Sequence, residues 1–133
     1  MNYAQISCVS LALAVLLGSV GAHAIKPYLS VEALNSWETA VKYQYYQSMG
    51  LLVLALAPRV IPMKAVFHRI AMHSLALGVL CFCGSLYLRS SSPLTGVDFS
   101  WLGPVAPLGG LLFVASWLIA AVSFGKRTAK AEE

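Results

Sequence analysis

The sequence predicts an all-α fold, an integral membrane four-helix bundle with up-down topology, formed by a single domain over residues 1–133. Three observations support this prediction. Hydrophobic residues make up 59% of the chain and charged residues only 11%, whereas a soluble domain carries roughly 25% charged residues. The uncharged stretches approach the roughly 20 residues that a helix needs to cross a bilayer. The charged residues fall between these stretches or at their edges.

The first apolar stretch, residues 3–25, has two interpretations. Ala22-His23-Ala24 resembles the cleavage site of a secretory signal peptide. Such a peptide begins with positive charge and has a short apolar core, whereas residues 1–8 contain no Lys or Arg and the uncharged run reaches 23 residues. Small residues that allow close helix packing recur every four positions, at Ser10, Ala14, Gly18 and Ala22. We therefore expect a retained transmembrane helix.

Three further apolar stretches predict the remaining spans, residues 40–58, 70–88 and 101–125. Lys42 lies close enough to the start of the second span to reach the interface. The fourth span opens with prolines and glycines, so its regular helix is expected to begin at Pro107, where the missing N–H costs nothing. A polar tail follows over residues 126–133. Further small residues expected to pack helices together are Gly84, Gly109 and Gly110.

The distribution of Lys and Arg predicts the orientation in the membrane. Four spans place the N-terminus, the second connection and the tail on one side. That side carries six basic residues, namely Arg59, Lys64, Arg69, Lys126, Arg127 and Lys130. The other side carries Lys26, Arg89 and the interfacial Lys42. Because basic residues favour the cytoplasmic side, both termini are expected on the cytoplasmic or matrix-equivalent side.

The same topology gathers polar residues in the extracytoplasmic half of the bundle. In the second helix, Ala40, Gln44, Gln47 and Leu51 share one face, which we expect to line the core. Glu38 and Lys42 lie nearly opposite and are expected to form an interfacial ion pair. The predicted polar cluster contains His23, Gln44, Gln47, Ser85 and Tyr87. Either it hydrogen-bonds the helices in register, or it holds a ligand, a lipid head group or an ion.

Other chemistry is poorly supported. Cys81 and Cys83 point apart on a helix, and His68 with Met72 lacks a third ligand at suitable spacing, so we expect no metal. His23 and Ser85 lack a residue that would orient the histidine, so we expect no catalytic site and no cofactor. The basic residues form no stripe interleaved with aromatics, which argues against a nucleic-acid partner.

Four segments together carry a resemblance to a known family: "GSVGAHAIK", "WETAVKYQYYQ", "FCGSLYL" and "WLGPVAPLGGLLFVASW". In this order and spacing they resemble the small four-helix membrane family catalogued as domain of unknown function 423, found in bacterial inner membranes and with mitochondrial transmembrane relatives. The resemblance implies that the Gly-Ala-His-Ala run belongs to the mature fold. Gln47 stands where many members are expected to carry His, and Cys83 where Ser is expected, so a role requiring an imidazole at position 47 does not carry over.

Two functions remain open. The first is a non-enzymatic structural or assembly protein, or an accessory subunit, of an energy-transducing inner membrane, either the bacterial plasma membrane or the mitochondrial inner membrane. Its expected partners are the lipid bilayer and other membrane protein subunits or further copies of the chain. The alternative is a small binding or transport protein that holds a lipid head group, a quinone or an ion in the extracytoplasmic half of the bundle.

Overall fold

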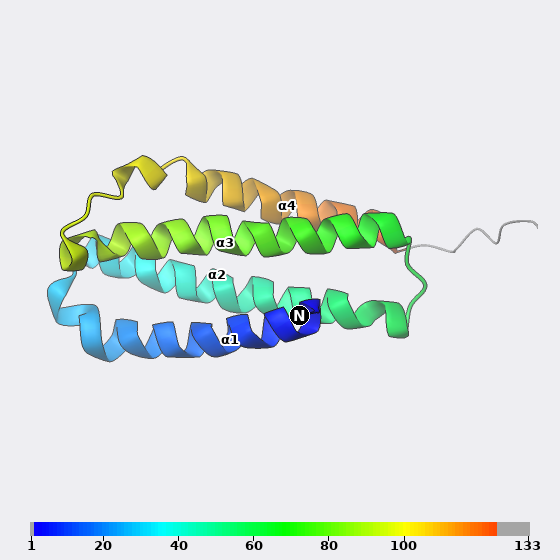
Figure 1. The fold of residues 1–133 in the computed structure, drawn as a ribbon, viewed down its shortest axis with the longest axis horizontal. Helices are drawn as coiled ribbons and strands as arrows, with labels where there is room; N and C mark the ends of the chain where they lie inside the picture. The colour runs from blue at the N-terminus through cyan, green and yellow to red at the C-terminus, as the bar shows by residue number, and fades with distance from the viewer. Residues whose placement is uncertain (1, 125–133) are drawn as a thin grey trace, which may run out of the picture.

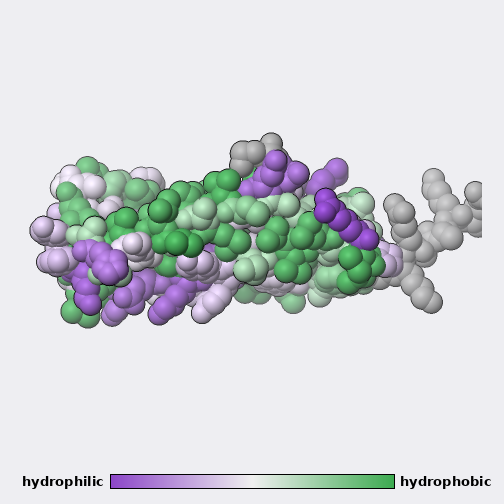
Figure 2. All heavy atoms as spheres, turned by 90° about the horizontal axis from the view of Figure 1, so that it is seen from below, coloured by the Kyte–Doolittle hydropathy of each residue, from purple (hydrophilic) through white to green (hydrophobic). Residues whose placement is uncertain are grey.

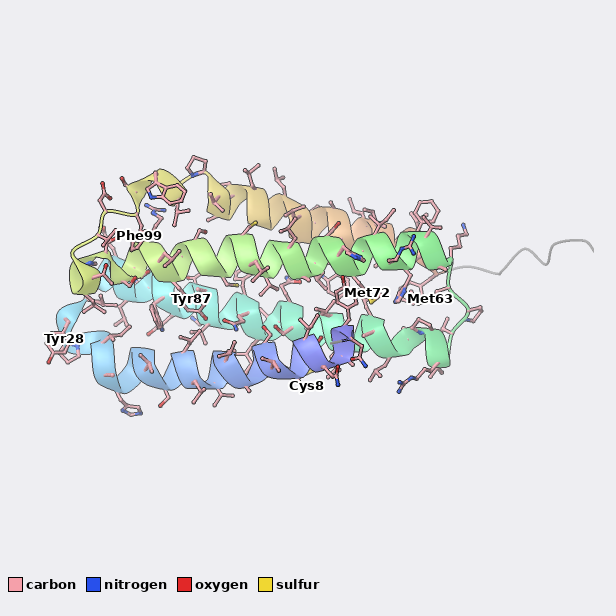
Figure 3. The ribbon with its side chains drawn as sticks, viewed as in Figure 1. Cys8, Tyr28, Met63, Met72, Tyr87 and Phe99 are labelled. Atoms are coloured by element: carbon pink, nitrogen blue, oxygen red, sulfur yellow. The ribbon has the colours of Figure 1, made fainter. Side chains whose placement is uncertain are left out.

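The computed structural model describes residues 2–124, which are mainly helical. The four long helices are α1 (Tyr3–Ser19), α2 (Val31–Leu56), α3 (Ala65–Thr95) and α4 (Val105–Ser123). A π-helical turn, Val20–Ile25, prolongs α1. Consecutive helices pack against each other and run in opposite directions, with α1 and α4 at opposite edges (Figure 1). Tyr28 and Phe99 mark one end of the bundle and Met63 the other (Figure 3).

Local sequence sets several helix ends. Asn2 accepts a hydrogen bond from the Gln5 backbone N–H, and the Gln5 side chain accepts one from the Asn2 N–H, so the two form a capping box at the start of α1. Ser30 caps α2 by accepting from the Ala33 N–H. α3 stops at Gly96, whose φ of 69° is the left-handed conformation that glycine adopts at little cost.

The helices differ in extent from the predicted spans. α2 begins at Val31 rather than residue 40, and α3 extends beyond both ends of the 70–88 span. α4 begins at Val105, so Pro107 is its third residue rather than its first. Three helical stretches among the described residues are long and apolar enough to cross a membrane, Tyr3–Tyr28, Ala65–Thr95 and Ser100–Ser123. α2 falls short of this because its first half is polar and charged.

Small residues bring α1 against α2. Ser7, Ala14 and Gly21 are the buried residues of α1 and its π-helical extension, at a spacing of seven. A Cβ on Gly21 would lie 2.7 Å from the Trp37 ring. The small residues predicted to pack at every fourth position, from Ser10 to Ala22, are buried only in part. In a helix with 3.6 residues per turn, positions four apart differ by about 40° in direction, so such a series gradually turns away from α2. Its last member, Ala22, is therefore exposed.

Glycines also bring α3 against α4. A Cβ on Gly109 would lie 2.7 Å from Cβ and 2.8 Å from Cα of Phe82, so only glycine allows this approach of the two backbones. A Cβ on Gly110 would only touch the Phe82 ring, at 3.9 Å, and one on Gly84 would meet nothing within 4 Å. Of the three glycines expected to pack helices, Gly109 does so most closely. The core nearby is formed by Leu51, Leu54, Ala71, Leu75, Phe113 and Ala120.

The surface has the pattern of a membrane protein. Hydrophobic residues form a band across the middle of the face in Figure 2, and hydrophilic residues gather toward both ends. Many large apolar side chains on this surface are exposed, including Leu80 at 72% and Leu111 at 65%. Such exposure would be unfavourable in water but is favourable against lipid.

Candidate functional site

A cleft of about 460 Å³ lies between α1 and α3, with α2 as its floor, and is called here the α1–α3 cleft. It arises because α1 packs mainly on α2 and meets α3 chiefly near its own start, where the Tyr3 and His73 rings contact edge to face with centroids 5.3 Å apart. Leu13 and Leu80 line the cleft and are themselves exposed, so it is open to the surroundings on one side. Its walls are almost entirely apolar. The lining residues are Tyr3, Ile6, Val9, Ser10, Leu13, Leu17, Gln44, Ser48, Leu51, Ala76, Val79, Leu80, Cys83, Gly84 and Tyr87.

A polar network centred on Gln44 interrupts these apolar walls. The Gln44 side chain is only 5% exposed. Its Nε2 donates to the Ser10 carbonyl oxygen at 3.0 Å, and its Oε1 accepts from the Tyr87 hydroxyl at 2.8 Å. The Ser10 and Ser48 hydroxyl oxygens are 2.6 Å apart and share a hydrogen bond. The network therefore joins α1, α2 and α3, and a ligand in the cleft would meet polar atoms that are already paired.

Trp37 and Tyr87 stand at the Tyr28 end of the cleft. Their rings contact edge to face, with centroids 4.8 Å apart. The Trp37 Nε1–H donates to the Leu17 carbonyl oxygen at 2.9 Å, and Tyr87 lies between α3 and α2 (Figure 3). Because both polar groups have partners, the Trp37 ring can be buried and the Tyr87 ring partly buried at this level of the bundle.

The structure brings together two of the five residues of the predicted polar cluster, Gln44 and Tyr87. Gln47 lies on the α4 side of α2, where its Oε1 accepts from the Trp117 Nε1–H at 2.9 Å. Ser85 is buried, but it donates to the Phe82 carbonyl of its own helix. His23 is exposed on the π-helical turn.

Two members of the network were not predicted as part of it. Ser10 was expected only to pack helices, and Ser48 was not singled out. The signal for Ser48 is its spacing, because it follows Gln44 by four residues and so shares its helix face.

The predicted ion pair is not seen. Glu38 and Lys42 are both exposed on the outer face of α2, and no ion pair within 4.0 Å joins them among the residues that the structure describes. The burial of Ala40, Gln44 and Leu51 on the opposite face agrees with the face predicted to line the core.

A separate buried contact links α2 to α3 near the Met63 end. The Leu54 carbonyl would normally accept from the backbone N–H four residues later, but that residue is Pro58, which has none. The His68 side chain, 8% exposed, approaches this carbonyl with Nε2 at 2.8 Å. The contact requires the tautomer with hydrogen on Nε2. Pro58 at this spacing was the available sequence signal for a buried donor nearby.

The described residues offer little for metal chemistry. Within residues 2–124 no group of three or more His, Cys, Asp or Glu side chains is placed to hold an ion. The three cysteines are free and differ in exposure, from the exposed Cys8 to the buried Cys83. The features that stand out chemically are therefore the α1–α3 cleft and the Gln44 network in its wall.

Comparison with known proteins identifies the family. The model of the family described as "Protein of unknown function (DUF423)" matches residues 17–110. The chain belongs to this family. The match confirms the resemblance inferred from the four sequence segments, and the apolar helices together with the membrane proteins described next confirm the predicted location in a membrane.

Several relatives are named as membrane proteins. A UPF0382 membrane protein of Staphylococcus haemolyticus is 37% identical over 106 residues, covering 80% of each chain. The UPF0382 membrane protein YwdK of Bacillus subtilis is 36% identical, covering 84% of this chain and 85% of its own. The UPF0382 inner membrane protein YgdD of Escherichia coli is 31% identical, covering 81% and 77%. These names state no activity, and no solved structure matches the chain.

Proposed function

We propose that this chain is a small non-enzymatic membrane protein that binds one long hydrocarbon chain of an amphiphile in the α1–α3 cleft. The observation that carries the proposal is the shape of the cleft. From Tyr3 to Leu17 it follows α1 for about 21 Å, at 1.5 Å per residue. Its volume of about 460 Å³ then corresponds to a mean cross-section of roughly 22 Å².

This cross-section favours a lipid chain over a protein helix. A helix about 10 Å across requires roughly 80 Å², several times the available section. An extended alkyl or prenyl chain is much thinner, and the total volume lies within the range of about 300–1,000 Å³ typical of small-molecule sites. The small-residue surface of α1 is already used against α2, which weakens the motive for a partner helix there.

The proposed placement in the membrane follows from charge and hydropathy. We place all four helices across the bilayer, with α2 shielded between α1 and α3, and the Met63 end toward the cytoplasm because the connection there carries Arg59, Lys64 and Arg69. The name of the Escherichia coli relative, an inner membrane protein, favours an inner membrane. The cleft then begins in the cytoplasmic half and ends in the extracytoplasmic half, at Tyr87.

Gly84 supplies the experiment. A Cβ added there meets nothing within 4 Å, and Gly84 lines the cleft, so the longer side chain of Gly84→Leu should extend into the cleft without disturbing the backbone. Gly110→Leu is the matched control, because Gly110 also has space but lies outside the cleft. Native mass spectrometry of the purified chains should find a retained lipid on the parent and on Gly110→Leu, and little on Gly84→Leu. Equal retention by all three chains would refute the proposal.

A structural, assembly or accessory role is the second candidate. The observation that favours it is that α1 and α4 occupy opposite edges of the bundle and pack mainly on one neighbour each, which leaves their outer faces open (Figure 1). Native electrophoresis after mild solubilisation, with mass spectrometry of the comigrating proteins, tests this role. Migration of the chain alone would count against it, whereas stable comigration with a larger complex would favour it.

A further inference from the structure

A second cleft, smaller and more polar, lies between the start of α2 and the later turns of α3. Its volume is about 220 Å³, and we call it the head-group cleft. Ser30, Glu32 and Ser36 contribute from the α2 side, and Arg89 and Ser90 from α3. Arg89 directly follows the predicted third span, so the cleft lies at the level where a bilayer's polar head groups begin.

Ser90 indicates that the head-group cleft is built for a ligand. Its side chain is 2% exposed, and its hydroxyl is the only buried side-chain polar atom among residues 2–124 that has no hydrogen-bond partner. Leaving a buried hydroxyl unpaired is unfavourable. Because Ser90 lines the cleft, an acceptor atom bound there would complete its hydrogen bonding.

The charges around the cleft have both signs. Arg89 and Glu32 both line it, yet within the described part of the chain they form no ion pair within 4.0 Å. The N-terminus of α2 adds positive potential. The Ser30 hydroxyl accepts from the Ala33 N–H and the Ser30 carbonyl from the Leu34 N–H, whereas the N–H groups of residues 31 and 32 have no acceptor within the helix. Glu32 would repel a ligand that carries only negative charge, and Arg89 would repel one that carries only positive charge, so the cleft suits a ligand with both charges.

We propose that the head-group cleft binds a phosphate that carries a primary ammonium group, the chemistry of phosphoethanolamine. The phosphate takes the Arg89 guanidinium, the Ser90 hydroxyl and the free N–H groups of α2, and the ammonium takes the Glu32 carboxylate. The proposal concerns a different cleft from the proposed hydrocarbon site and does not depend on it.

Lipid competition on the purified full-length chain tests this proposal. Phosphatidylethanolamine, phosphatidylglycerol and phosphatidylcholine with identical acyl chains are offered together in mild detergent, and bound lipid is counted by native mass spectrometry. We expect phosphatidylethanolamine to be retained about tenfold over the other two, the ratio that one added charge-assisted hydrogen bond provides. Equal retention of the three lipids would overturn the proposal.

Two pairs of variants assign the preference to this cleft. Ser90→Ala removes the unpaired hydroxyl and should lower phosphatidylethanolamine retention without lowering the stability of the lipid-free chain. Its control is Ser91→Ala, because the Ser91 hydroxyl donates to the Leu88 carbonyl of its own helix. Arg89→Gln should abolish the preference, whereas Arg69→Gln at the other end should not. Unchanged retention in Ser90→Ala and Arg89→Gln would overturn the proposal.

Two further experiments distinguish a soluble ligand from a bilayer lipid, and the head-group cleft from the α1–α3 cleft. Soluble glycerophosphoethanolamine carries the same head group without acyl chains. If it raises the melting temperature as phosphatidylethanolamine does, the ligand is a soluble compound; if only the phospholipid does so, the ligand is a bilayer lipid. If neither compound raises the melting temperature, the proposed recognition of a phosphoethanolamine group is wrong. Gly84→Leu should leave the head-group preference intact, so failure of the hydrocarbon site and failure of this proposal are distinguishable.

Discussion

The contact between His68 and the Leu54 carbonyl makes a quantitative prediction about stability. The carbonyl belongs to a residue that is 2% exposed, and Pro58 removes its normal helical donor. His68→Leu keeps an apolar side chain of similar size but leaves the carbonyl unpaired. An unpaired buried acceptor costs about 1–3 kcal/mol, so the free energy of unfolding should fall by that amount.

A double-mutant cycle separates this hydrogen bond from general packing. Pro58→Ala restores a backbone N–H at position 58, which can donate to the Leu54 carbonyl. In that background His68→Leu should cost about 1–2 kcal/mol less than in the parent chain. The effect of Pro58→Ala on the unfolded chain is common to both arms and cancels.

The free energies can be measured by SDS titration in mixed micelles, followed by tryptophan fluorescence and far-ultraviolet circular dichroism. His73→Leu is the matched control. His73 is exposed, its Nδ1 contacts the Arg69 carbonyl of its own helix at 2.7 Å, and its ring touches the Tyr3 ring, so none of these contacts involves position 54 or 58. Its cost should not depend on the residue at position 58. If His68→Leu costs the same in both backgrounds within about 0.5 kcal/mol, the role assigned to His68 is refuted.

Three further predictions use the same preparations. Gly109→Ala should lower the free energy of unfolding by about 1–3 kcal/mol because the new Cβ meets the Phe82 backbone, whereas Gly110→Ala should change it little; equal effects in the same SDS titration would contradict this. Tyr87→Phe leaves Gln44 Oε1 without its donor and should lower the free energy of unfolding by about 1 kcal/mol. An unfolding curve identical to that of the parent chain would argue against the network. The Ser100 backbone N–H and hydroxyl hold the pKa of the exposed Asp98 carboxyl below its ordinary 3.8. The stabilisation by these hydrogen bonds is therefore fully present above the pKa of Asp98 in the unfolded chain and is lost as the pH falls through its pKa in the folded chain. An NMR titration that gives Asp98 a pKa at or above 3.8 would contradict this prediction.

The sequence predicted the face of α2 correctly because that helix is amphipathic. Glu38 and Lys42 are costly to bury in the bundle, and their exposure turns Ala40, Gln44 and Leu51 toward the other helices. In α3 the lipid-facing and core-facing residues are both apolar, so periodicity says little about how the helix is rotated. For that reason the sequence did not show that Ser85 would bond within its own helix while Tyr87 would reach Gln44.

The exposure of His23 has a different cause. The sequence predicted a continuous helix from residue 3 to residue 25, but the last part of it is a π-helical turn. Gly21 takes the position against Trp37, and the next residues stay on the outside. The rule that polar groups in a membrane face the bundle interior applies to the bilayer core, whereas His23 is exposed on the turn at the end of the bundle, where a polar side chain does not need a partner from another helix.

The α1–α3 cleft follows from where the small residues lie. Ala14 and Gly21 draw α1 onto α2, Gly78 and Gly109 draw α3 onto α4, and α2 packs on α3 at least as extensively as on α1. The α1 and α3 faces that border the cleft carry larger residues, such as Leu13 and Leu80. Small residues are what allow helices to approach closely in lipid, so away from the contact between Tyr3 and His73 these faces stay apart and leave a space that a lipid chain can fill. Gly84 is one of the small residues on this side, and it faces open space rather than a helix, so substituting it tests ligand binding more directly than it tests stability.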